Sequence, residues 1–410
     1  MAHRLPSTTN RMLVQTRTQR HSPARPPTLR RRARHSFTVT RSSSFTFQHR
    51  VRQLVGRIRS PDQAASAVIS RLPAGSFNRI IGITIAPGSD SSEELILRLE
   101  GIDVTVQARV LSWISRSTEL PVPRVLAYDN TTDNSIAERY ILMEKLPGVS
   151  LCHAIDDMTD AERLSMADNV AHLLGSIYSV PVPSGIGPLV LDKQGQPCVG
   201  LHVDGQDGAQ SSDDHGPVPA TLLAFLSTRF KEQRQYCQTR WPAGKRRISY
   251  YNRLLLAAEQ LLSPPFSLGE RNVLFHRGFA ARNILVHRTD GDWVISGVLD
   301  WDYCAVAPAE VAYVCPGWLW AEREESSVSG SFDEYDCNPD APPCDEIVEG
   351  IRGTFLAEVE GVLPGFTNII RAARARCLRQ LYELAGGIMR STADERKAEL
   401  VIAAASRLVS

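Results

Sequence analysis

Alternating leucines and helical apolar stripes divide the first half of the chain into short elements. In residues 92–101, leucine occupies positions 95, 97 and 99, which a strand places on one face, while Arg98 falls on the other face. Apolar residues at positions 104, 108, 111 and 114 have helical spacing. The same patterns predict a helix over residues 61–72 and strands within residues 74–85, 121–129 and 139–148.

The second half of the chain is expected to be mostly helical. Residues 222–236 and 250–262 have the helical period, and residues 347–409 predict terminal helices with a break at the Gly386-Gly387 pair. Residues 179–203 hold a Pro-rich stretch followed by a Gly-Gln-Pro turn, which indicates a surface hairpin. The expected strands are therefore concentrated in the first half of the chain.

The N-terminal 60 residues differ in composition from the rest of the chain. They contain fourteen Arg and no Asp, Glu or Lys, whereas the other 350 residues carry 32 basic and 45 acidic side chains. Residues 1–46 show no sustained periodicity, so disorder is expected. From Phe47 to Ile58 the apolar positions follow a helical period, which predicts a basic amphipathic helix.

This Arg-rich and Ser-rich head resembles a mitochondrial transit peptide, and a disordered extension without a targeting role is equally compatible with it. Nucleic-acid binding is not expected, because no aromatic platform or base-reading module accompanies the charge. No run of eighteen apolar residues predicts a membrane span, and the eight Cys form no CxxC pair. Even the closest two, Cys337 and Cys344, are expected to be reduced. We therefore expect a cytoplasmic or mitochondrial location.

The most informative segment covers residues 274–302, with the sequence LFHRGFAARNILVHRTDGDWVISGVLDWD. Kinase-type catalytic loops have the form His-x-Asp, with an Asn five residues after the Asp and a metal-binding Asp after a short hairpin. His276, Asn283 and Asp300 stand at that spacing. Gly278 stands where the loop should hold its catalytic Asp, so the fold is easier to predict than the activity.

An ordered set of motifs carries a family resemblance across roughly residues 61–320. The motifs are GSFNRI, RLEG, ELPVPRVLAYD, YILMEKLPGVSL, FHRGFAARNILV, GVLDWDYCAVAPAE and PGWL. In this order they resemble the aminoglycoside phosphotransferase family, which includes choline-kinase-like members, and in particular its large fungal branch. The loop HRGFAARN also resembles tyrosine-kinase loops. Only seven residues separate Asp300 from Pro308, however, which leaves no room for an activation loop and a peptide platform.

The resemblance implies an α+β, bilobal, protein-kinase-like fold with a small β-rich N-lobe and a larger, mostly helical C-lobe. The expected parts are a head over residues 1–60, an N-lobe over 61–148 and a C-lobe over 149–410 with its catalytic loop at 274–304. It also implies ATP and Mg²⁺ as cofactors. The partners would be a nucleotide and a small-molecule acceptor, such as an aminoglycoside or choline, whose hydroxyl receives the γ-phosphate.

Residue roles follow from the same resemblance. Asn283 and Asp300 would bind Mg²⁺, and His276 would brace the catalytic loop. Arg98 takes the place of the phosphate-pairing Lys on its strand. The remaining nucleotide-binding positions would be Gly75, Ser76, Phe77 and Asn78 in a turn over the phosphates, and Met143, Glu144 and Lys145 in a hinge that offers backbone groups to adenine.

Three departures from the family pattern leave the activity open. Gly278 replaces the catalytic Asp, Gln107 replaces the Glu of the N-lobe helix, and Arg98 replaces Lys. Asp302, which a strand would place on the same face as Asp300, is a candidate substitute carboxylate. One hypothesis is a phosphotransferase with impaired catalysis, and the alternative is a pseudokinase that binds nucleotide or ligand without transfer. Retained Asn283 and Asp300 favour nucleotide binding over a relic with neither activity.

Overall fold

The computed structural model describes residues 41–72, 79–85, 92–202, 209–210, 217–240, 245–263, 271–320 and 345–409. The chain divides into two units, Met1–Thr46 and Phe47–Ser410, and the description below concerns the second unit. The predicted phosphate-covering turn (Gly75, Ser76, Phe77 and Asn78) and the two Cys at positions 337 and 344 lie outside the described residues.

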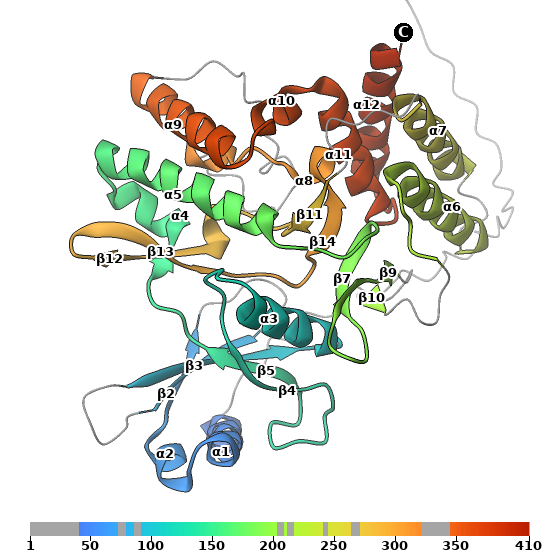
Figure 1. Ribbon diagram of the computed structural model, residues 1–410. Helices are drawn as coiled ribbons and strands as arrows, with labels where there is room; N and C mark the ends of the chain where they lie inside the picture. Colours follow the sequence, from blue (N-terminus) through green and yellow to red (C-terminus); the bar gives the residue numbers. More distant parts are fainter. Residues whose placement is uncertain are drawn as a thin grey trace, which may run out of the picture. The chain divides into compact units, whose positions relative to one another are not determined.

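Within the described residues, the expected bilobal α+β fold is confirmed, with a five-stranded antiparallel sheet in the first lobe and a mainly helical second lobe. Figure 1 shows the two lobes. The strand order of the N-lobe sheet is β1-β2-β3-β5-β4. Its strands are β1 (Val68–Leu72), β2 (Arg79–Ile85), β3 (Glu93–Glu100), β4 (Val125–Asp129) and β5 (Arg139–Glu144).

Strand β3 is the central strand of this sheet, between β2 and β5, and its two faces pack against different helices. Leu95, Leu97 and Leu99 are buried on one face, as the alternation predicted. That face packs under helices α1 (Arg41–Ile58) and α2 (Pro61–Ser66), whereas α3 (Thr105–Ser117) covers the opposite face (Figure 1). Arg98 therefore faces the α3 side, where the C-lobe begins.

The structure differs from the expected 60-residue head at its C-terminal end. The boundary between the two units falls between Thr46 and Phe47, and α1 runs on to Ile58. Its apolar stripe, expected as a basic amphipathic helix, is buried in the N-lobe: Val51, Leu54 and Val55 are at most 3% exposed. Burial of the leucine face of the sheet requires such a cover, so this stretch belongs to the lobe.

The helix predicted over residues 61–72 is wrong in its second half. Helix α2 begins after the N-cap Ser60, with Pro61 in its first turn, but it ends at Ser66. Strand β1 then pairs antiparallel with β2, from Val68 opposite Thr84 to Leu72 opposite Ile80. The ladder satisfies backbone groups along the β-branched residues of this segment, and tertiary pairing overrides the local helical spacing.

The C-lobe is built around α5 (Asp160–Ser179), which starts with a capping box formed by Thr159 and Glu162. The predicted helices over residues 222–236 and 250–262 are present and begin or end several residues beyond those ranges, as residues 222–240 and 245–261. The terminal helices are interrupted at Gly386, where α11 ends. The other helices are α4 (Leu151–Ala154), α6 (Leu222–Arg240), α7 (Lys245–Leu261), α8 (Ala309–Ala312), α9 (Glu346–Val362), α10 (Phe366–Arg371), α11 (Ala373–Ala385) and α12 (Thr392–Val409).

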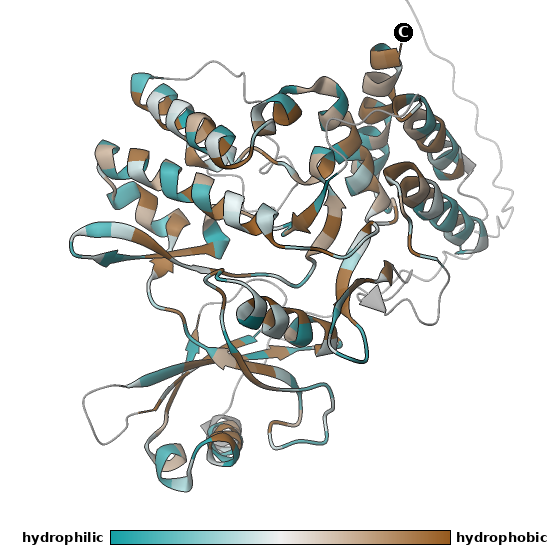
Figure 2. Ribbon diagram, viewed as in Figure 1, coloured by the Kyte–Doolittle hydropathy of each residue, from teal (hydrophilic) through white to brown (hydrophobic). Residues whose placement is uncertain are grey.

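Two small sheets of the C-lobe carry the predicted catalytic segment. One has the order β11-β14-β7-β8 and the other β13-β12-β6. Figure 2 shows β11 as a hydrophobic strand, and Val273, Leu274 and Phe275 are buried. The strands are β6 (Val149–Ser150), β7 (Gly187–Leu191), β8 (Pro197–Val199), β9 (Leu201–His202), β10 (Ala209–Gln210), β11 (Asn272–Phe275), β12 (Ile284–Thr289), β13 (Asp292–Val298) and β14 (Ala305–Pro308).

A close backbone approach joins the connection between the lobes to the catalytic hairpin. Gly148 has a φ of +99°, and a Cβ there would lie 2.2 Å from the carbonyl oxygen of Val286. Only glycine tolerates both conditions. The predicted Pro-Gly turn thus brings β6 alongside β12. Among the described helices, none is long and apolar enough to cross a membrane.

The burial of α1 predicts that the helix stabilises the N-lobe. Leu54→Ala should lower the free energy of unfolding by about 2–5 kcal/mol, because it removes a buried leucine side chain. Gln53→Ala on the exposed face of the same helix should change it by less than about 0.5 kcal/mol. Urea unfolding of both variants measures the difference. Equal, small effects would mean that α1 does not pack on the sheet.

Candidate functional site

The segment after β11 folds back so that both ends of the predicted catalytic motif meet. β11 pairs with β14 from Asn272 opposite Pro308 to Phe275 opposite Ala305, so the chain leaves and re-enters one sheet at adjacent positions. Between these strands lie a 3-10 turn (Ala281–Asn283) and the β12–β13 hairpin. The motif residues, spread over 25 positions from 276 to 300 in sequence, are thereby brought together.

His276 joins the two ends of this segment through both ring nitrogens. Its Nε2 lies 2.9 Å from the carbonyl oxygen of Leu299 and donates to it, and its Nδ1 accepts from the backbone N–H of Gly278 at 3.1 Å. The ring also packs edge-on against Trp301, with centroids 4.5 Å apart. Burial lowers the pKa of His276 to about 4, so the imidazole is neutral near pH 7.

Asn283 holds Asp300 beside the backbone of Gly278. Its Nδ2 donates to the Gly278 carbonyl oxygen at 2.8 Å and to Asp300 Oδ2 at 3.3 Å. These two bonds orient the amide so that Asn283 Oδ1 faces away from them and is left as an acceptor. The Asn283 backbone carbonyl also accepts from the N–H of Leu299 at 2.8 Å, next to Asp300.

The expectation that Asp300 and Asp302 share one face of a strand is wrong. Strand β13 ends at Val298, and both carboxylates lie in the turn before β14. Asp300 has a φ of +68°, a left-handed conformation that non-glycine residues adopt rarely. This backbone turn directs Asp300 towards Asn283 and Asp302 towards the N-lobe, so the two side chains have different partners.

Charge and desolvation act together on Asp300. Desolvation by the surrounding protein raises the pKa of Asp300 above its ordinary range, although part of the residue is exposed. The negative charge of Asp302 adds to this rise. Arg98, Arg282 and the Asn283 hydrogen bond act in the opposite direction. A cation bound at Asp300 would favour the charged form of this carboxyl.

The surroundings of Gly278 leave room for a Cβ atom. A Cβ built at this position would lie 3.5 Å from Asn283 Nδ2 and 3.6 Å from the ring atoms of His276, which are ordinary van der Waals distances. Its φ lies outside the left-handed region, so the backbone does not require glycine. The missing carboxylate is therefore not a steric necessity of this loop.

Arg98 connects β3 to the catalytic segment through a bidentate ion pair. Its Nη1 donates to Asp302 Oδ1 at 2.9 Å and its Nη2 donates to Asp302 Oδ2. On the same strand face, its Nε lies 2.5 Å from Glu100 Oε1. The side chains of all three residues are at most 14% exposed. Two carboxylates, one from each lobe, therefore hold the guanidinium in place.

Gln107 on α3 contacts this network indirectly. Its side chain hydrogen-bonds to Glu100 rather than occupying a place beside Arg98. Burial raises the pKa of Glu100, and the positive charge of Arg98 opposes that shift. Glu100 was not among the sequence-predicted site residues, although its position two residues after Arg98 on a strand places both on one face. Trp301, which packs on His276, had no comparable signal.

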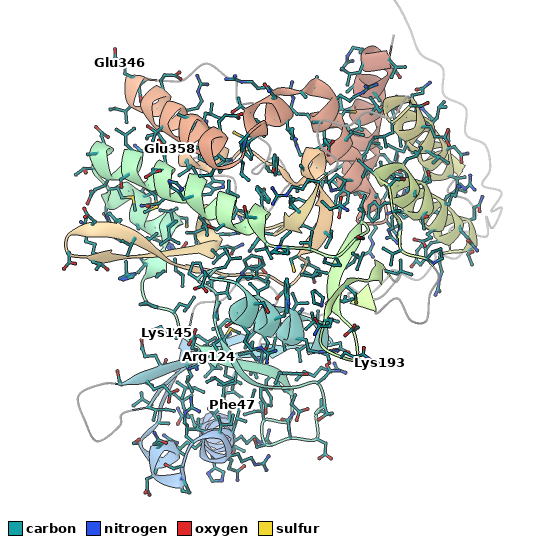
Figure 3. All side chains as sticks on the ribbon, viewed as in Figure 1. Phe47, Arg124, Lys145, Lys193, Glu346 and Glu358 are labelled. Atoms are coloured by element: carbon teal, nitrogen blue, oxygen red, sulfur yellow. The ribbon has the colours of Figure 1, made fainter. Side chains whose placement is uncertain are left out.

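Two backbone N–H groups of the predicted hinge donate hydrogen bonds within the N-lobe. The N–H of Glu144 donates to the Arg124 carbonyl oxygen at 3.0 Å, and the N–H of Lys145 donates to the Glu94 carbonyl oxygen at 2.9 Å. Lys145 also pairs with the Glu94 carboxylate at 2.9 Å. Met143 is buried between β3 and β4. Figure 3 labels Lys145 and Arg124 at the edge of the N-lobe that faces the C-lobe.

Comparison with known families and proteins gives matches over most of the two lobes. The profile of the family described as "Phosphotransferase enzyme family" matches residues 88–347. The chain is 25% identical over 222 residues to clavilactone A biosynthesis cluster protein Y of Ampulloclitocybe clavipes, a match that covers 52% of each protein. It is 24% identical over 119 residues to a subtelomeric hrmA-associated cluster protein of Aspergillus fumigatus, covering 28% of this chain and 23% of that protein. The chain thus spans about half or less of the length of these relatives.

The solved structures to which the chain is similar include an aminoglycoside phosphotransferase and a choline kinase. The aminoglycoside phosphotransferase APH(4)-Ia is 16% identical, with a TM-score of 0.48 over 88% of this chain and 98% of that chain. Choline kinase from Cryptosporidium parvum Iowa II is 12% identical, with a TM-score of 0.46 over 88% of this chain and 95% of that chain.

The buried neutral His276 predicts a specific acid sensitivity. The unfolded chain takes up a proton near the ordinary His pKa of 6.5, whereas the folded chain takes it up only near pH 4. Because the unfolded state binds more protons in this window, stability is fully present above pH 6.5 and falls as the pH drops towards 4. The contribution of His276 is up to about 3 kcal/mol.

Urea unfolding of the parent and of His276→Gln between pH 7 and pH 4 measures this contribution. The parent should lose more free energy of unfolding over that interval than the variant does, whatever the stability of each at pH 7. Equal losses would show that His276 is protonated in the folded protein.

Proposed function

Because the chain belongs to the phosphotransferase enzyme family, we propose that it binds ATP with Mg²⁺ between Arg98 and the Asn283–Asp300 pair, and that its phosphoryl transfer to a small-molecule hydroxyl is impaired. The observation that carries the proposal is the Asn283 amide. It bonds both to Asp300 and to the backbone of Gly278, so the metal-binding pair stands beside a position that offers no carboxylate. Membership of the family supports the reaction class, and the contacts of Asn283 support the choice of residues.

The donor atoms at this position suit Mg²⁺. Asn283 Oδ1 and the Asp300 carboxylate are oxygen ligands, which magnesium prefers together with phosphate oxygens and water. When bound, Mg²⁺ would neutralise negative charge that develops on the phosphates during transfer. Asn283 and Asp300 would hold it, and the His276 bonds to Gly278 and Leu299 would keep both ligands in place.

Arg98 would face the phosphates from the N-lobe. Kinases use a Lys paired with a helix Glu at this position. Here Glu100 and Asp302 hold the guanidinium, and the charge of Arg98 opposes the rise that burial causes in the pKa of Asp300. Such an arginine, oriented before the nucleotide arrives, can donate to phosphate oxygens through N–H groups that form a planar fork.

The acceptor hydroxyl would lose its proton without assistance from residue 278. General-base catalysis typically contributes about 10²–10⁴-fold, whereas positioning and charge neutralisation supply most of the remaining rate in phosphoryl transfer. Asp302 is engaged with Arg98, which argues against its serving as the replacement base. Slow rather than absent transfer follows if an acceptor is positioned well.

The second candidate is a binding module that holds nucleotide or another ligand without transfer. Two observations favour it: Gly278 has no side chain, and the candidate substitute carboxylate, Asp302, is engaged in an ion pair with Arg98. The two candidates agree on nucleotide binding and differ only in turnover, so they are separated by measuring transfer in a variant with a restored carboxylate.

Nucleotide binding predicts a thermal shift that depends on Asp300. At a hundredfold excess over its dissociation constant, Mg²⁺–ATP should stabilise the parent by roughly 2.7 kcal/mol, a rise of several degrees in Tm. Asp300→Ala should remove most of this shift because it deletes a metal ligand. Asp292→Ala, which deletes an exposed carboxylate on the neighbouring hairpin, should retain it. No shift in the parent at millimolar nucleotide and metal would refute nucleotide binding.

Restoring the carboxylate predicts a gain in turnover. Gly278→Asp should raise phosphoryl transfer by about 10²-fold or more, since the Cβ fits and the carboxylate stands five residues before Asn283. Gly278→Asn is the matched control, with a similar shape and no basic carboxylate. Transfer from radiolabelled ATP to candidate amino alcohols and aminoglycosides is the measurement.

Two outcomes of that measurement test the phosphotransferase candidate, and the absence of transfer in the parent and in Gly278→Asp would favour the binding module. A rise with Asp but not with Asn supports a phosphotransferase that lacks its base. Robust transfer by the parent that is unchanged in Gly278→Asp but lost in Asp302→Asn would identify Asp302 as the base. That result would contradict the impaired site.

A further inference from the structure

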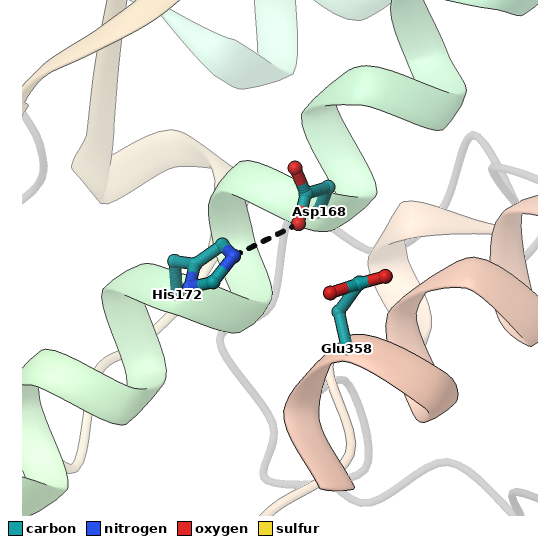
Figure 4. A group of neighbouring side chains, drawn as sticks. All are labelled: Asp168, His172 and Glu358. Atoms are coloured by element: carbon teal, nitrogen blue, oxygen red, sulfur yellow. Dashed lines mark ion pairs between the residues drawn. The ribbon is translucent and has the colours of Figure 1, made fainter. Parts of the chain in front are cut away.

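Three metal-ligating side chains meet on the outer surface of the C-lobe, on the pair of helices α5 and α9. Asp168 and His172 lie one turn apart on α5, and Glu358 reaches towards them from α9 (Figure 4). The candidate ligand atoms of the three residues all lie within 4.8 Å of one another. They are separated in sequence by nearly 190 residues, so only the packing of the two helices assembles them.

Close packing between α5 and α9 fixes the relative positions of the three side chains. At Gly175 of α5, a Cβ would approach Val362 Cγ2 of α9 to 2.9 Å, and at Gly350 of α9 a Cβ would meet Leu164 Cδ2 of α5 at 3.5 Å. These two contacts show α5 and α9 running in the same direction with a constant offset. Glu358 therefore lies at the level of His172, between the two contacts.

Asp168 and His172 form a close ion pair whose geometry does not meet the requirements of a hydrogen bond. Nε2 of His172 lies 3.1 Å from Oδ1 of Asp168. Oδ1 is shielded from solvent, yet it has no hydrogen bond of acceptable geometry. A shielded carboxylate oxygen without a hydrogen bond is costly, and a bound cation at this position would satisfy it.

The stretches of the two helices nearest the three side chains carry no Lys or Arg, although α5 has Arg163 and α9 has Arg352 further towards their N-termini. Two carboxylates face each other across the interface, and the sequence has no Lys or Arg at positions 164–176 of α5 or 354–362 of α9. His172 is the only basic group in those two stretches. A divalent ion would neutralise the two carboxylates and use the imidazole as a neutral ligand.

We propose that Asp168, His172 and Glu358 bind a divalent transition-metal ion, with Zn²⁺ the best fit, and that this ion fastens α9 to α5. Imidazole nitrogen and carboxylate oxygen are both ligand types that Zn²⁺ accepts, and three protein ligands leave a fourth tetrahedral position for water. Mg²⁺ and Ca²⁺ prefer sets of oxygen ligands alone, and Ca²⁺ needs six or more of them. The site is separate from the nucleotide-binding residues, and its existence does not depend on the proposed phosphotransfer.

Co²⁺ is a suitable probe because it replaces Zn²⁺ and its visible spectrum reports coordination. Titration of metal-free full-length protein with Co²⁺, in the presence of millimolar Mg²⁺ to occupy oxygen-only sites, should give the intense bands of a four-coordinate site. Sulfur-to-cobalt charge-transfer absorption should be absent, which excludes the cysteines as ligands. Zn²⁺ should then displace the bands and raise the Tm by about 2 °C or more at a hundredfold excess over its dissociation constant.

Variants of the ligands assign the site. His172→Ala and Glu358→Gln should each weaken Co²⁺ binding by about tenfold or more, since changes to groups that only support ligands already cost 10–100-fold. Matched controls are His153→Ala, an exposed histidine on α4, and Glu346→Gln, an exposed carboxylate at the start of α9, and both should bind as the parent does. The metal-free variants should keep the Tm of the parent within about 2 °C, because these side chains are substantially exposed.

Two results would overturn the proposal. One is a parent spectrum that remains that of aqueous octahedral Co²⁺ throughout the titration. The other is a four-coordinate spectrum that persists unchanged in His172→Ala and Glu358→Gln. Neither result bears on the Asp300-dependent nucleotide shift, so the two proposals succeed or fail separately.

Discussion

The ion pair between Arg98 and Asp302 is the interaction on which the arrangement of the site depends. A guanidinium with little solvent access must have its charge matched, and removal of one partner of such a pair leaves a buried charge at a cost of several kcal/mol. Arg98 satisfies this condition with Glu100 from its own strand and Asp302 from the C-lobe. The pair therefore sets where β3 lies relative to the turn that carries Asp300.

Gln107 belongs to the same network of contacts. Its side chain hydrogen-bonds to Glu100, and Glu100 pairs with Arg98, so α3 is linked to the guanidinium through a carboxylate of the strand. The guanidinium spans a wider fork than an ammonium and can contact carboxylates on two sides at once. Under the proposed assignment, in which Arg98 stands where kinases have Lys and Gln107 where they have Glu, the two residues would belong to one network rather than being two separate defects.

The catalytic loop keeps its shape without the side chain that usually gives it its activity. The backbone of Gly278 takes part twice, through its N–H to His276 and through its carbonyl oxygen to the Asn283 amide. Neither bond needs a side chain at position 278. The contacts that hold Asn283 and Asp300 together therefore do not depend on a side chain at position 278, which would separate the proposed nucleotide binding from turnover in physical terms.

The sequence by itself determined the elements and spacings that depend on neighbouring residues. The alternating leucines of β3, the apolar stripe of α3 and the spacing of His276, Asn283 and Asp300 were all predictable, because strand and helix periods and loop lengths are local properties. Only the tertiary structure decided the interactions that join distant segments. Arg98 and Asp302 are 204 positions apart, α1 became part of the N-lobe by covering the sheet, and residues 68–72 became a strand by pairing with β2. Local periodicity shows which face of an element is apolar, but the partner that buries that face, or neutralises a charge on it, is chosen by long-range packing.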